Sequence, residues 1–367
     1  MQLCRVPRRF VNVHDTNQAD LKICRSLLRG GSRTFLAASH LLPHRVRDRA
    51  CALYAFCRVA DDAVDLAPSG VGALDSVRAR LERIYAGPAP DDAVDRALAR
   101  VVHEVEIPRV LLDALLEGFD WDASGRRYRT LEELESYAAR VAGSVGAMMA
   151  LLMGVRAPEL VARACDLGVA MQLSNIVRDV GEDARRGRIY LPLQWLEEAG
   201  VDIEAWLGAP RFEPALEQVA RRLLGVAQCY YRQAELGIAA LPRACRPGIR
   251  AAGRLYAEIG EQVARNGFDS VSRRAIVSPQ RKLLVLAAGL APHPRQGAKS
   301  VRDGAATRFL VEAVVAQAPP PTPLPAKVRA GSSAGAEDRW KSLIDLFTRL
   351  ERRDAVHAAR RVSSAGS

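Results

Sequence analysis

The chain has 367 residues, of which 49% are hydrophobic and 26% are charged. These proportions are typical of a globular protein and exclude a disordered or fibrous chain. The 53 Lys and Arg against 42 Asp and Glu leave a net charge of +11, which predicts an anionic partner: nucleic acid, a membrane surface or a phosphorylated substrate.

The N-terminal residues 1–18 are basic and lack the apolar core of a secretory signal, so we assign them to an N-terminal extension. The seven cysteines are scattered and include no CxxC pair, which argues against a disulfide framework or a zinc site. Free thiols are typical of a reducing compartment, and the expected location is therefore the cytoplasm.

Helical periodicity dominates residues 19–302, which we predict to form a single all-α domain. One predicted helix face carries Leu74, Val77, Leu81 and Ile84. Proline and glycine breaks allow about ten helices of ordinary length. The longest uncharged run, Val141 to Val155, is shorter than the roughly 20 residues that span a membrane. We interpret it as a buried helix whose three methionines suit an apolar wall: Met148, Met149 and Met153.

Two acidic pairs stand out, Asp61 with Asp65 and Asp179 with Asp183. In each pair the residues are four apart, which places both carboxylates on one face of a helix. Because such carboxylates repel one another, two pairs in apolar surroundings indicate a bound cation. Mg²⁺ prefers oxygen ligands and combines protein carboxylates with substrate phosphates. The alternative is a solvated acidic face that forms salt bridges to Arg58 and Arg178.

The amino-acid composition of the C-terminal part differs from that of the preceding domain. Residues 303–336 are rich in Pro, Ala and Ser and predict a linker. Residues 337–367 place Trp340, Leu343 and Phe347 at helical spacing and predict an amphipathic tail. Before the linker, residues 271–302 carry seven Lys or Arg, no acidic residue and the apolar run Leu283 to Leu290. That segment suits either peripheral contact with the inner face of the cytoplasmic membrane or packing on the core.

Longer motifs resemble the squalene/phytoene synthase family, and within it the bacterial phytoene synthases. The two acidic pairs lie in YAFCRVADDAVD and QLSNIVRDVGEDARRGRIYLP, and the likeness continues in ARVAGSVG and RNGFDSVSRRAIVSPQRKL. It covers roughly residues 20–290. The resemblance implies an all-α isoprenoid synthase fold, a helical bundle of the trans-prenyltransferase type around a central cavity.

The resemblance also implies roles for individual residues. Asp61, Asp65, Asp179, Asp183 and Tyr137 would be catalytic. The ligands of Mg²⁺ or Mn²⁺ would be Asp61, Asp65, Asn175, Asp179 and Asp183. Contacts with prenyl diphosphate would come from Ser32, Arg33, Thr34, Phe35, Tyr54, Arg58, Gln172, Arg178 and Tyr256. Arg185, Arg186 and Arg188 would either close over the diphosphate or form a solvated basic loop.

The implied reaction joins two geranylgeranyl diphosphates head to head. It would pass through a cyclopropyl (prephytoene) diphosphate to phytoene, release two diphosphates, need no NADPH and serve carotenoid biosynthesis. A first alternative within the family uses farnesyl diphosphate to make presqualene diphosphate, squalene or dehydrosqualene. A second alternative is a catalytically silent assembly protein on the same fold. The expected partners are prenyl diphosphate, the membrane surface and downstream carotenoid enzymes. The sequence contains no motif for binding nucleic acid, and we do not expect nucleic acid to be a partner.

Overall fold

A computed structural model describes residues 13–31, 33–65, 73–87, 90–288 and 304–317, and this part of the chain is helical without a strand. The first half contains α1 (Val13–Gly31), α2 (Arg33–Ser39), α3 (His44–Asp65), α4 (Ala73–Ala86), α5 (Ala93–Val105), α6 (Arg109–Ala123), α7 (Leu131–Ala138), a π-helical turn η1 (Ala139–Gly143) and α8 (Ser144–Leu152). The second half contains α9 (Pro158–Ala184), α10 (Leu193–Glu198), α11 (Ile203–Gly208), α12 (Pro214–Ile238), α13 (Arg246–Arg265), α14 (Pro279–Ala288), a 3₁₀ turn η2 (Ala305–Thr307) and α15 (Arg308–Ala316).

The all-α prediction is confirmed, but the described residues form fifteen α-helices rather than about ten. Several of the extra helices are short, such as α2, α10 and α11. Some of the predicted proline breaks begin a helix as well as ending the previous one. Pro158, Pro214 and Pro279 each open a helix, a position where the missing N–H of proline costs no hydrogen bond.

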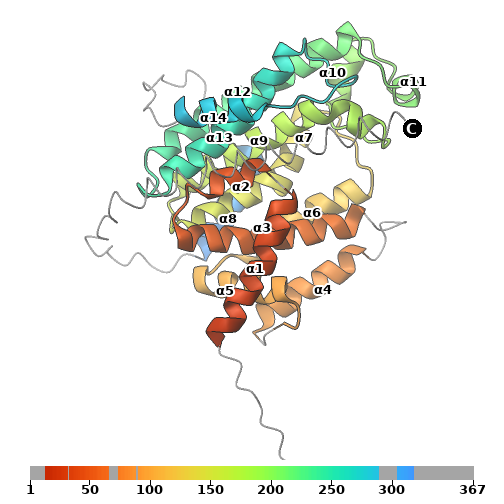
Figure 1. The fold of residues 1–367 in the computed structure, drawn as a ribbon. Coiled ribbons are helices and arrows are strands. Elements are labelled where there is room, and N and C mark those ends of the chain that lie inside the picture. The colour runs from red at the N-terminus through yellow and green to blue at the C-terminus, as the bar shows by residue number, and fades with distance from the viewer. Residues whose placement is uncertain (1–12, 32, 66–72, 88–89, 289–303, 318–367) are drawn as a thin grey trace, which may run out of the picture.

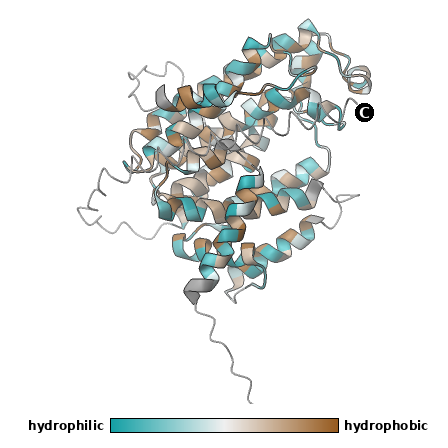
Figure 2. Cartoon of the chain, in the orientation of Figure 1, coloured by the Kyte–Doolittle hydropathy of each residue, from teal (hydrophilic) through white to brown (hydrophobic). Residues whose placement is uncertain are grey.

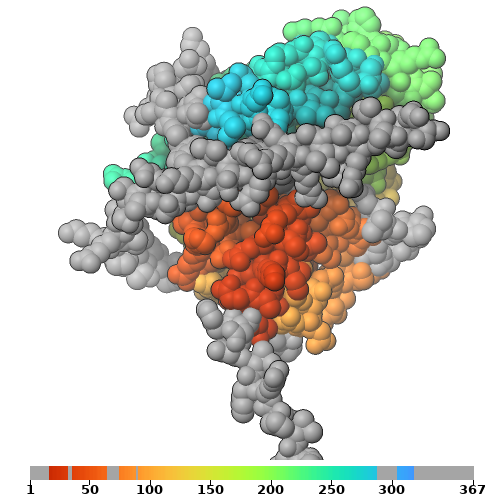
Figure 3. Space-filling view, in the orientation of Figure 1, coloured from red at the N-terminus to blue at the C-terminus, as the bar shows by residue number. Residues whose placement is uncertain are grey.

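Helix α9 is the centre of the bundle. It packs against α8, α12, α13 and the π-helical turn, while α1, α3 and α5 pack together on another side (Figure 1). In the space-filling view, α1 and α3 occupy the lower part of the molecule and the helices α12 and α13 the upper part (Figure 3). Apolar residues are concentrated on helix faces inside the bundle, and polar residues on the outer faces (Figure 2).

The central position of α9 explains its composition. It is the only helix among the described residues that is long and apolar enough to cross a membrane. Val169, Leu173 and Val177 on α9 are fully buried in the protein core. We therefore interpret its apolar character as core packing.

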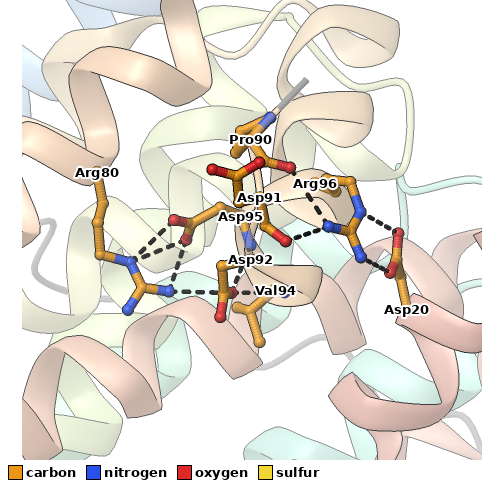
Figure 4. A network of polar contacts seen from close by, with 8 residues as sticks. All are labelled: Asp20, Arg80, Pro90, Asp91, Asp92, Val94, Asp95 and Arg96. Carbon is orange, nitrogen blue, oxygen red and sulfur yellow. Dashed lines mark hydrogen bonds and ion pairs between the residues drawn. The ribbon is translucent and has the colours of Figure 1, made fainter. Parts of the chain in front are cut away.

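Buried ion pairs join the N-terminal helices. Asp20 on α1 is 1% exposed and accepts a hydrogen bond from Arg96 on α5 at 2.7 Å (Figure 4). It accepts another from Arg100 on the same helix, also at 2.7 Å. Arg80 on α4 binds the buried carboxylate of Asp95 at 2.8 Å (Figure 4). Removing one partner of such a pair leaves an uncompensated charge, so these contacts hold α1 and α4 against α5 in a defined register.

The predicted buried helix at Val141 to Val155 is present as the end of η1, then α8 and the residues after it. Its polypeptide backbone lies very close to α9, because Gly168 has no side chain to separate the two. A Cβ atom at Gly168 would overlap the carbonyl oxygen of Ala142, which belongs to the π-helical turn. Turns of this kind within α-helices are frequent at functional sites.

Part of the predicted linker 303–336 is ordered. Residues 308–316 form α15, which packs on α6, α8 and α9. Leu310 and Val314 are fully buried in the core. The prediction is wrong for this stretch, because its Phe, Leu and Val residues supply an apolar helix face that the composition of the whole segment concealed. The predicted tail 337–367 and most of the extension 1–18 lie outside the described residues.

Candidate active site

Two adjoining cavities lie beside α9. One is polar, has a volume of about 200 Å³ and is lined from α3, α6, α7, α9 and the segment after α9. The other is apolar, has a volume of about 300 Å³ and is lined mainly from α3, η1, α8, α9, α12 and α13. Gln172 and Asn175 line both cavities, so polar and apolar surroundings meet at these two side chains.

The polar cavity brings together carboxylates from two helices. Asp61 comes from α3, and Asp179 and Asp183 come from α9. Asp65 is the last residue of α3, and its side chain lies outside the described residues. Three of the four predicted aspartates therefore share one cavity although about 120 residues separate the two motifs.

The carboxylates of α9 have opposite electrostatic surroundings. Burial raises the pKa of Asp179, but hydrogen bonds from Arg178 and Arg274 outweigh burial and leave that pKa below its usual value. Burial and the charges of Asp179 and Glu182 raise the pKa of Asp183 to about 7. A carboxylate in such surroundings is stabilised by a cation brought close to it.

Asn175 supplies a further oxygen ligand. Its side-chain oxygen is buried and has no hydrogen-bond partner, although the residue lines the polar cavity with Asp179 and Asp183. An unsatisfied buried oxygen is costly, and a hard cation such as Mg²⁺ prefers amide and carboxylate oxygens. Among the described side chains, no group of three His, Cys, Asp or Glu is already arranged to hold a metal. Arginines pair with Asp61 and Asp179 instead, and the carboxylate and amide oxygens at this cavity are of the type that Mg²⁺ prefers.

The predicted catalytic Tyr137 belongs to a buried cluster. Its hydroxyl donates a hydrogen bond to Asp122 Oδ2 at 2.9 Å, and the Tyr190 hydroxyl donates to Asp122 Oδ1 at 2.7 Å. The rings of Tyr128, Tyr137 and Tyr190 lie against one another with centroids 5.1–6.2 Å apart. Burial raises the pKa of Asp122 to about 6, although both tyrosine hydroxyls oppose that effect.

The apolar cavity contains another part of the predicted set. Phe35 stacks on Tyr54 with ring centroids 5.5 Å apart, and Tyr256 also lines the cavity. Of the three methionines predicted for its wall, Met149 and Met153 line it. Met148 is fully buried and packs in the core instead. The apolar lining suits a long hydrocarbon and excludes water from it.

Arg58 and Arg178, two of the arginines predicted to contact the diphosphate, do not line either cavity. Arg58 is 43% exposed and pairs with Asp61 and Asp62, the latter at 2.6 Å. Arg178 pairs with its neighbour Asp179, whose side chain is only 17% exposed. Salt bridges of the kind expected for a solvated acidic face are thus present, but burial of Asp179 contradicts solvation. Ser32 and the side chains of Arg33 and Thr34 lie outside the described residues.

Three polar residues at the site were not identified from the sequence. Asp122 and Tyr190 line the polar cavity, and Arg274 donates to Asp179 Oδ1 at 2.7 Å. Each lies far along the chain from the residue that it contacts, so the helical spacing of residues does not predict the contact. Of the arginines after α9, Arg186 and Arg188 line the polar cavity. Arg185 turns away and donates to the carbonyl oxygen of Val271 at 3.1 Å.

Comparisons with known proteins agree with this architecture. The model of the squalene/phytoene synthase family matches residues 28–282. Phytoene synthase of Rhodobacter capsulatus is 54% identical over 273 residues, which are 74% of this chain and 80% of the relative. Phytoene synthase of Cereibacter sphaeroides is 52% identical over 278 residues, 73% of this chain and 78% of the relative.

Solved structures share the fold. A dehydrosqualene synthase in complex with a ligand has a TM-score of 0.68 at 30% identity and covers 75% of this chain and 96% of its own. Squalene synthase from Alicyclobacillus acidocaldarius has a TM-score of 0.64 at 25% identity, with coverage of 70% and 97%. The bundle, the paired aspartates at one polar cavity and the match over residues 28–282 agree, and the chain belongs to the squalene/phytoene synthase family.

Proposed function

We propose that this protein joins two geranylgeranyl diphosphates head to head and makes phytoene in carotenoid biosynthesis. The observation that carries the proposal is the junction of the two cavities at Gln172 and Asn175. A prenyl diphosphate has a highly charged head and a long apolar chain, and the two cavities match these two parts. The names of the relatives that are 54% and 52% identical support the phytoene product.

Mg²⁺ or Mn²⁺ is the proposed cofactor. Asp61, Asn175, Asp179 and Asp183 would hold it from the polar cavity, with Asp65 added from the end of α3. When bound, the ions neutralise the charge that develops on departing diphosphate. Arg186 and Arg188 line the same cavity and would add donors to the diphosphate oxygens.

The other side chains act on the prenyl chains. Tyr54 and Phe35 present stacked rings at the apolar cavity, where a ring face stabilises cationic carbon. Exclusion of water by the apolar lining directs the allylic cation to the double bond of the second substrate. The buried hydroxyls of Tyr137 and Tyr190, held by Asp122, lie at the polar side. Loss of a proton, rather than delivery of hydride, would end the reaction, so no NADPH is proposed.

A second function is favoured by the structural neighbours, which are named dehydrosqualene and squalene synthases. In that case the substrate would be farnesyl diphosphate. The deciding experiment gives purified protein either the C15 or the C20 diphosphate with Mg²⁺, with and without NADPH, and identifies the extracted lipids. Phytoene from C20 without NADPH is the expected result. Only C30 products would establish the second function, and absence of any product from either substrate would favour a silent assembly protein.

We further propose that the protein works in the cytoplasm and touches the inner face of the membrane through the segment 271–284. Ile276 and Leu284 in this segment are 76% and 62% exposed. Arg273 and Arg281 stand close to them in the sequence and are also exposed. Exposed apolar and basic side chains together favour an anionic lipid surface.

Replacing both arginines with Gln should weaken sedimentation with anionic liposomes, whereas unchanged sedimentation would favour simple packing of α14 on the core. Membrane contact would also bring the product near downstream carotenoid enzymes.

A further inference from the structure

The apolar cavity reaches far from the diphosphate end. Its lining follows α9 from Asn175 back to Leu160, which at a rise of about 1.5 Å per residue is about 22 Å. Arg163 on α9 and Gly237 on α12 line the cavity near the Leu160 end. The two ends of the cavity therefore have different surroundings. One end meets the polar cavity with its carboxylates, and the other end lies at the start of α9.

An open surface groove lies next to that far end. It has a volume of about 620 Å³ and is lined from the start of α9, the end of α12 and the η2–α15 segment. Leu160, Arg163 and Gly237 line both the groove and the apolar cavity. These three residues form the partition between the cavity and the groove, and α15 forms the far wall of the groove through Val311.

The partition is thin because Gly237 has no side chain. A Cβ atom there would lie 2.5 Å from Arg163 Cβ and 2.9 Å from Arg163 Cγ, so the aliphatic stem of Arg163 fills the gap. The Arg163 side chain is 20% exposed, and its Nε lies 3.1 Å from Oδ2 of the buried Asp166. Rotation about χ1 leaves Arg163 Cβ in place and moves Cγ and the atoms beyond it, so the part of the side chain beyond Cβ is the movable part of the partition.

The chemistry of the product favours release at this end. A C40 hydrocarbon has no polar group, and moving it past Asp61, Asp122 and Asp179 would place it against charges that require water or cations. The groove instead has Leu236, 46% exposed, in its wall from α12 and Val311 in its wall from α15. These apolar side chains would receive a hydrocarbon more favourably than the polar cavity.

We propose that the hydrocarbon product leaves through the groove between α9, α12 and α15, and that Arg163 is the gate between the cavity and this groove. The proposal rests on the proposed function, because it concerns the fate of the apolar product. It assigns separate routes to the two products: diphosphate leaves from the polar cavity, and the hydrocarbon leaves past Arg163. Helix α15 lies outside the part of the chain that the family model matches, whereas Arg163 and Gly237 lie inside it.

The test obstructs the groove without touching either cavity. Val311→Trp places a large ring in the groove, and Val315→Trp is the matched control on the same face of α15, outside the groove lining. Diphosphate release in a single turnover should be the same in both variants and in wild type. Steady-state turnover should fall about tenfold in Val311→Trp alone, because product release becomes limiting. Hydrocarbon should then co-elute with that variant in gel filtration.

A second comparison keeps the proposal testable if Val311→Trp does not fold. The double variant Arg163→Ala with Asp166→Asn removes the gate, and Asp166→Asn alone is its control. Less hydrocarbon should co-elute with the double variant than with the control. Equal retention by the double variant and its control would overturn the proposed route, and so would equal turnover of Val311→Trp and Val315→Trp. Absence of diphosphate release by wild type in a single turnover would instead overturn the proposed function.

Discussion

Asp122 and Tyr137 are joined by a hydrogen bond of 2.9 Å at the edge of the polar cavity, and Tyr190 binds the other oxygen of the same carboxylate. One acidic side chain on α6 thus orients two hydroxyls that come from other parts of the chain. Asp122 is a positioning residue in this arrangement, because it acts through the two tyrosines.

Replacing Asp122 with Asn should lower kcat/KM. An amide has one acceptor oxygen, so one of the two tyrosine hydroxyls loses its acceptor, at a cost of about 1–3 kcal/mol or about 5- to 150-fold in rate. The control is Asp120→Asn, because Asp120 lies on the same helix but pairs with Arg78 on the outside. Steady-state kinetics checks the prediction. Equal activity of both variants would contradict a positioning role, and Tyr137→Phe should reproduce part of the loss.

Asp61 and Asp62 are adjacent but differ in what they face. Asp61 lines the polar cavity, whereas Asp62 pairs with Arg58 at 2.6 Å and does not line it. Asp61→Asn should therefore raise the Mg²⁺ concentration needed for half-maximal activity about 10- to 100-fold. Asp62→Asn should leave it close to the wild-type value. Mg²⁺ titration of initial rates measures both, and a similar requirement in the two variants would argue against Asp61 as a ligand.

Gly168 should tolerate no side chain. A Cβ atom there would overlap the carbonyl oxygen of Ala142, so Gly168→Ala should push α9 from the π-helical turn and cost about 1–3 kcal/mol in the free energy of unfolding. At Gly225 on α12, a Cβ atom would meet no neighbouring group within 4 Å. Gly225→Ala should therefore stabilise the protein by about 0.5–1 kcal/mol. Urea unfolding of the two variants gives the comparison, and destabilisation by both would indicate a general cost of alanine.

Asp166 should make stability depend on pH. It is 1% exposed, and burial raises its pKa to about 6, with Arg163 opposing only in part. The folded state therefore binds this proton more tightly than the unfolded chain. Its contribution is fully present below about pH 4 and is lost as pH rises through about 6. Asp166→Asn should be more stable than wild type at about pH 7.5, by up to about 3 kcal/mol, and no more stable at about pH 4.

Urea unfolding at the two pH values measures this effect, with Glu159→Gln, exposed at the start of the same helix, as the control. A difference between wild type and Asp166→Asn that is the same at both pH values would show that the carboxyl group does not titrate in this range.

Residues close in the sequence were predictable. Asp179 and Asp183 share a helix face because α-helical periodicity alone places side chains four apart on one face. The absence of charged residues from Val141 to Val155 predicted the buried helix there, and the length of the family motifs indicated the fold. Contacts between distant segments were not predictable in this way. Asp122 and Tyr190 are in contact only because α6 and the segment after α9 pack against one another, and no local sequence pattern predicts that contact.

The sequence by itself determined the all-α class, the residue types of the polar cavity and the family, because each depends on local spacing or on contiguous motifs. Only the tertiary structure decided that Gln172 and Asn175 join two cavities of opposite polarity. It also decided that α15 belongs to the bundle, although composition predicted a linker. The physical reason is that burial depends on which faces meet, and small residues such as Gly168 and Gly237 control how closely helices or their side chains approach.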